Sequence, residues 1–131
     1  MEIVYDRTTD SYCWKQINAQ ASIFDEEKKT GEYPIDHRTV RRFIAAWKPN
    51  IEKKFRQGVR RIFGVEFDEK VICYINSTPY SMEVPGGISI SAGTKTPIRS
   101  ICHEANHVMF RQSIFKKKYF PCYTIYIKNY I

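Results

Sequence analysis

The sequence predicts an α+β fold in which several helices pack on a small mixed or antiparallel sheet, within a single domain spanning residues 1–131. Three observations lead to this prediction. Apolar residues recur at helical spacing as far as Gly64, two strand-like runs follow, and a new helix begins at Thr96-Pro97. With 131 residues, 43% of them hydrophobic, the chain is long enough for one core and too short for two ordinary domains.

Two helices are expected before Pro49. The first starts from a capping residue at Asp10 or Ser11 and ends by Gly31, since glycine and proline interrupt the pattern there. Its apolar positions are Trp14, Ile17, Ala21 and Phe24. The second starts from a cap at Asp36 and is broken by Pro49. Its apolar side consists of Val40, Phe43, Ile44 and Trp47.

A third helix is expected from Asn50 to Gly64. Its apolar stripe consists of Ile51, Phe55, Val59 and Ile62. Beside this stripe lies a basic face made of Lys53, Lys54, Arg56, Arg60 and Arg61. We favour a solvated face on a core-packing helix, because surface helices normally carry charge; a nucleic-acid-binding surface is the alternative, and the net charge of +7 suits it.

Two strands are expected after the basic helix. Lys70–Ile75 is apolar at successive positions, which predicts a strand covered on both faces. Ile88–Ala92 alternates strictly between apolar and polar residues, which predicts one buried face, with Ser89 and Ser91 on the uncovered one.

The helix at about residues 97–112 carries the chemistry. Thr96 is a good cap and Pro97 suits the first helical position. At about 100° per residue, one side of this helix is apolar and the other holds His103 and His107. The apolar stripe consists of Ile98, Ile101, Ala105, Val108 and Met109.

The run His103-Glu104-Ala105-Asn106-His107 has the spacing of a helix-borne zinc site. Residues four apart lie one above the other, so two imidazoles can reach one cation. Glu104 is then placed at the edge of the same surface to act as a general base on a water molecule. The sequence therefore predicts Zn2+ at His103 and His107, with Glu104 as the catalytic residue.

From Val71 to Gln112 the chain resembles the zincin-like metallopeptidases, above all the small intracellular bacterial and phage type. The resemblance implies a zinc-dependent metallopeptidase acting on a peptide or protein substrate. It also implies that the strand before the active helix, Ile88–Ala92, is a sheet edge on which an extended peptide docks.

The usual third zinc ligand of that family, a downstream Glu, Asp or His, does not occur after His107. Cys122 is the strong donor left there, and thiolate is a good zinc ligand, although a buried apolar role is the alternative. His37 and Glu83 are weaker upstream candidates, and Cys102 is expected in the core. A final strand is expected over Cys122–Ile127.

Three further expectations concern the whole protein. It should be cytoplasmic, with reduced thiols and no membrane partner, because its start lacks a signal sequence and it has no run of 18 apolar residues. If the metal site is degenerate, the protein is a non-catalytic binding protein or a basic nucleic-acid-binding module. If Cys122 closes the site, the zinc is structural, and removing it unfolds the chain.

Overall fold

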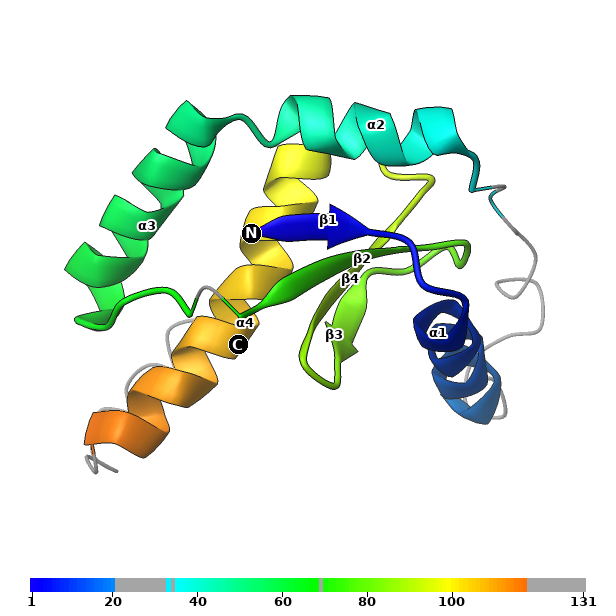
Figure 1. The fold of residues 1–131 in the computed structure, drawn as a ribbon. Helices are drawn as coiled ribbons and strands as arrows, with labels where there is room; N and C mark the ends of the chain where they lie inside the picture. The colour runs from blue at the N-terminus through cyan, green and yellow to red at the C-terminus, as the bar shows by residue number, and fades with distance from the viewer. Residues whose placement is uncertain (21–32, 34, 69, 118–131) are drawn as a thin grey trace.

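A computed structural model describes residues 1–20, 33, 35–68 and 70–117, with side chains as far as Gln112. The elements in this part of the chain are β1 (Glu2–Val4), α1 (Arg7–Gln20), α2 (His37–Ala46), α3 (Pro49–Phe63), β2 (Ile72–Asn76), β3 (Met82–Val84), β4 (Gly87–Ser91) and α4 (Pro97–Lys117). The described residues thus form an α+β structure of four helices and one mixed four-stranded sheet, as predicted (Figure 1).

The strands are ordered β1-β2-β4-β3 across the sheet. β1, β2 and β4 are parallel, and β3 returns antiparallel to β4 through a tight turn at Gly86. Cys73 in β2 lies between Ile3 of β1 and Ile88 of β4. The short strands β1 and β3 were not predicted, because three residues are too few to show a period.

The two faces of the sheet are covered by different helices. α4 packs across β4 and β3, and α1 lies against β2 and β3 (Figure 1). α2 lies beside β1 and α3 beside α4, so the basic helices flank the sheet rather than cover it. The core lies between α4 and the sheet, where Ile88, Ile90 and Ile101 have no solvent exposure.

Two predictions about the strand at Ile88–Ala92 are wrong. It is not a sheet edge, because β4 pairs with β2 on one side and β3 on the other. Its serines are not exposed either: Ser89 is 0% and Ser91 5% exposed, because α1 covers that face. The Ser89 hydroxyl accepts a hydrogen bond of 2.7 Å from the Asn76 amide, and the Ser91 hydroxyl donates one of 2.6 Å to the Thr78 carbonyl.

The helix boundaries follow the caps, with one correction. Asp36 caps α2 as predicted, accepting a hydrogen bond of 2.8 Å from the Thr39 amide. α1 instead begins at Arg7 and is capped by Asp6, whose carboxylate accepts from the Thr9 amide at 2.8 Å. Asp10, the predicted cap, binds Ser77. The predicted Ala21 and Phe24 positions lie outside the described residues.

α3 and α4 also match their predicted starts. Pro49 is the first residue of α3, and Gly64 ends it in the left-handed conformation at φ 65°. α4 starts at Pro97 and extends to Lys117, beyond the predicted end at Gln112. Two residues predicted for the apolar sides of α2 and α3 are not buried: Ile44 is 52% and Ile62 60% exposed.

None of the helices in the ranges just given is long and apolar enough to cross a membrane.

Candidate metal centre

α4 presents the two histidines to solvent. Ile101, Ala105 and Met109 are fully buried against the sheet, so the opposite side of the helix faces outward. His103 and His107 are exposed on that side, one helical turn apart. The predicted division of this helix into an apolar stripe and a histidine face is confirmed for Ile101, Ala105, Val108 and Met109, but Ile98, in the first turn, is 39% exposed and does not belong to the buried stripe.

The two imidazoles have the separation that a tetrahedral metal ion requires. Their Nε2 atoms are 3.2 Å apart, and the ring planes make an angle of 81° with centroids 4.8 Å apart. Two zinc–nitrogen bonds of about 2.0–2.1 Å at a tetrahedral angle place the nitrogens about 3.3–3.4 Å apart. Both nitrogens therefore fit one ion with a shift of only tenths of an ångström.

The same distance fits a direct hydrogen bond between one neutral imidazole that donates and one that accepts. Both Nε2 atoms can bind a metal ion only when the donating imidazole carries its proton on Nδ1 instead, so the hydrogen-bonded and the metal-bound arrangements exclude each other.

Glu104 lies on the flank of α4 between the histidine side and the core. It is only 9% exposed, and burial raises the pKa of its carboxyl above the ordinary value. The histidines counteract this effect on the pKa and the carboxylate of Glu83 adds to it. A raised pKa brings a carboxylate closer to the range in which it can accept and return a proton near neutral pH.

Glu83 reaches α4 from the edge strand β3. Its carboxylate forms an ion pair with the Arg111 guanidinium, one turn beyond His107, and lies near enough to affect the pKa of Glu104. The ion pair therefore ties β3 to the segment of α4 that carries the motif. Sequence reasoning missed Arg111, although its position four residues after His107 placed it on the same side of the helix.

The structure does not assemble a third metal donor from the residues it describes. No group of three His, Cys, Asp or Glu side chains that could hold an ion occurs among them. Glu83 is paired with Arg111, and His37 is exposed in the first turn of α2. Cys102 is a free thiol, half-buried against the core as expected. Cys122 and the final strand over Cys122–Ile127 lie outside the described residues and stay predictions.

No protein-family model matches the chain, and no curated protein and no solved structure is significantly similar to it.

Proposed function

We propose that this protein is a zinc-dependent metallopeptidase of zincin-like fold that hydrolyses peptide bonds. The observation that carries the proposal is the 3.2 Å separation of the His103 and His107 Nε2 atoms beside the largely buried Glu104. A structural pair of exposed histidines needs neither that separation nor a costly buried carboxylate next to it.

In this mechanism His103 and His107 would hold the ion through their Nε2 atoms. Zinc, when bound, lowers the pKa of a neighbouring water and polarises the scissile carbonyl. Glu104 takes the proton of that water as it attacks and then delivers it to the departing amine. The partly dehydrated position of Glu104 suits this role, because its raised pKa makes it a stronger base than an exposed glutamate.

We assign the peptide-docking role to β3 rather than to β4. β3 is the terminal strand of the sheet that the described residues form and runs antiparallel to its neighbour, so within this part of the chain no strand pairs with its outer edge. An extended peptide can add to such an edge through main-chain hydrogen bonds. Glu83 and Arg111 would then lie at the border between the bound peptide and α4.

Glu104→Gln tests the proposal, because the amide keeps the shape of the side chain but cannot accept the proton. We expect the variant to keep its fold and its zinc affinity while hydrolysis of a quenched fluorescent peptide library falls about 10²- to 10⁴-fold. Glu66→Gln, at an exposed glutamate beyond α3, is the matched control and should retain activity. Full activity of Glu104→Gln would show that the base is another group.

A non-catalytic binding protein of the same fold is the second candidate, and the lack of a third donor among the described side chains favours it. The two candidates differ in one measurement. Zinc-loaded protein that binds peptides without cleaving them, with Glu104→Gln binding equally well, would support the non-catalytic function.

A further inference from the structure

The net positive charge of the chain is concentrated in α2 and α3. Residues 37–63 contain nine Lys and Arg residues and one acidic residue, Glu52, for a net charge of +8. The whole chain has 21 Lys and Arg against 14 Asp and Glu, a net charge of +7. The other residues therefore sum to −1, and an anionic partner would be attracted to these two helices specifically.

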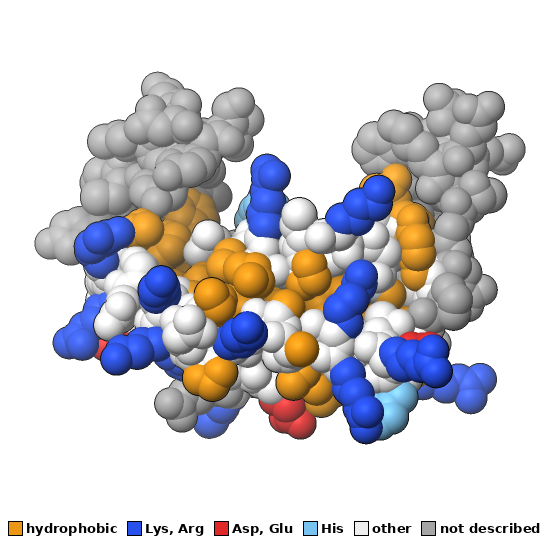
Figure 2. All heavy atoms as spheres, turned by 90° about the horizontal axis from the view of Figure 1, so that it is seen from above, with side chains coloured by type: hydrophobic (Ala, Val, Ile, Leu, Met, Phe, Trp, Pro, Cys, Tyr) orange, Lys and Arg blue, Asp and Glu red, His pale blue; other side chains and the backbone are white. Residues whose placement is uncertain are grey.

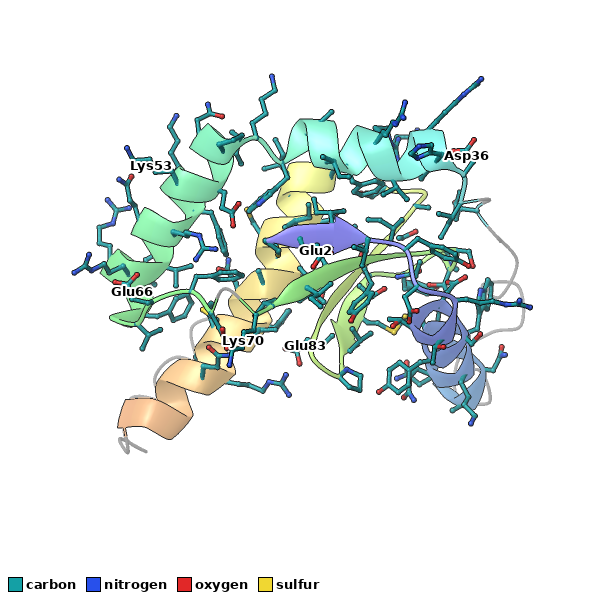
Figure 3. The ribbon with its side chains drawn as sticks, in the orientation of Figure 1. Glu2, Asp36, Lys53, Glu66, Lys70 and Glu83 are labelled. Carbon is teal, nitrogen blue, oxygen red and sulfur yellow. The ribbon has the colours of Figure 1, made fainter. Side chains whose placement is uncertain are left out.

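Six of the nine basic side chains are exposed and have no hydrogen-bond or ion-pair partner in the described part of the chain. They are Arg38, Arg41, Lys48, Lys53, Lys54 and Arg61. Seen from above, Lys and Arg side chains are spread over the face that α2 and α3 form, with acidic side chains only near its margins (Figure 2). Lys53 projects outward from α3, away from the sheet (Figure 3).

The other three basic residues serve the fold. Arg42 donates to the Ala92 carbonyl at 2.8 Å, and Arg56 pairs with Glu52 at 2.9 Å. Arg60 pairs with Glu66 at 3.1 Å. A shallow hollow of about 340 Å³ on α3 is lined by both of these ion pairs, and its two carboxylates make it a poor anion site. The six unpaired residues, which we call the basic face, are the ones available to a partner.

We propose that the basic face binds the phosphate backbone of a nucleic-acid duplex without reading its sequence. At 1.5 Å per residue the face extends over about 20 Å along α3, from its N-cap Lys48 to Arg61, and over about 5 Å along α2, from Arg38 to Arg41. A duplex carries a phosphate charge about every 1.7 Å of its axis, so several of the six cations can be matched at once.

The composition of the face favours a duplex over other anionic partners. Single strands are bound by stacking bases on aromatic rings, and the exposed aromatic side chains of the described residues, Tyr5, Tyr33 and Tyr80, all lie outside α2 and α3. A helix that lies on an anionic membrane exposes a broad apolar side with Trp, Phe or Leu. Here Phe43, Trp47 and Val59 are buried in the core, and only Ile44 and Ile62 among the large apolar residues of these helices are exposed.

The inference is independent of the metal site and is tested by fluorescence anisotropy with a labelled 25-base-pair duplex of DNA, and one of RNA, over a series of salt concentrations. If the basic face neutralises about five phosphates, the logarithm of the association constant should fall with log[NaCl] at a slope of about −4.5. The association constant should then fall roughly 500-fold between 50 and 200 mM NaCl. Binding should be unchanged by EDTA and in His103→Ala, which separates this result from any failure of the proposed peptidase.

The decisive variant is Lys53→Gln/Lys54→Gln, which removes two charges from the basic face. It should make the salt slope less steep by about 1.8. Arg7→Gln/Lys15→Gln removes the same charge from exposed positions on α1 and should leave the slope unchanged. Equal slopes for the two variants, no binding at 50 mM NaCl, or tighter binding to single strands or to phosphatidylserine vesicles would overturn the proposal.

Discussion

Zinc affinity is the most informative quantity to measure, because the described residues bring together two candidate donors, His103 and His107, and the predicted third donor, Cys122, lies outside them. A structural zinc site with four protein ligands releases about 10–16 kcal/mol, or about 2.5–4 kcal/mol for each ligand. His103 and His107 alone should therefore contribute about 5–8 kcal/mol, which corresponds to a Kd between about 0.2 mM and 1 μM. A third protein donor should tighten this by about two orders of magnitude.

The assay is competition with a chromophoric zinc chelator at neutral pH. His103→Ala and His107→Ala should each abolish measurable binding, and His37→Ala, at an exposed histidine on α2, is the matched control. Binding in the two-ligand range that does not change in Cys122→Ser would confirm the two-ligand account. Nanomolar binding that survives both Cys122→Ser and Glu83→Gln would refute it.

Three further predictions concern stability and thiol reactivity. Gly87→Ala should lower the free energy of unfolding, measured by urea titration, by about 3 kcal/mol, because the new Cβ would lie 2.1 Å from the Ile72 carbonyl oxygen. Gly58→Ala is the control and should be neutral or stabilising, because the space around Gly58 is open. Equal effects of the two substitutions would contradict the close approach of the strands at Gly87. Because the pKa of Glu104 is higher in the folded than in the unfolded protein, ionisation of this carboxyl destabilises the fold as the pH rises through the folded-state pKa. Metal-free Glu104→Gln should therefore be more stable than the parent at pH 7, by about 1.4 kcal/mol for each unit by which folding raises the pKa. The difference in stability between the variant and the parent should vanish below pH 4.5, the ordinary pKa of a glutamate. Equal stability at pH 7 would mean that the Glu104 carboxyl is exposed to solvent. Burial raises the pKa of Cys73 to about 12, so iodoacetamide at pH 8 should modify half-buried Cys102 in the native protein well before Cys73, as peptide mapping would show.

The sequence was sufficient to predict those features that depend only on residues within one or two helical turns. The starts of α2 and α4 and the glycine end of α3 were predicted from local caps, and the two sides of α4 from its period. The same reasoning gave His103, Glu104 and His107 their places, with the histidines exposed and Glu104 between them and the core.

Features that depend on distant segments could not be predicted. Ser89 alternates with isoleucines as in an exposed edge strand, yet α1 covers it, and nothing within the strand encodes that cover. The ion pair between Glu83 and Arg111 joins residues 28 positions apart and depends on β3, which is too short to detect. Whether Cys122 is a zinc ligand stays a prediction, because its position lies outside the part of the chain that the structure describes.

The placement of the histidine pair on the outer side of α4 makes metal binding and folding separable traits. Neither imidazole is part of the buried core, and among the described residues their side chains form a hydrogen bond to each other, so replacing them removes no packing that the sheet depends on. Glu104 differs, because its side chain is largely buried at the helix flank. If His103 and His107 hold zinc as proposed, a single substitution at either position would remove the metal and keep the fold, and a protein altered in this way could still use its other surfaces for binding.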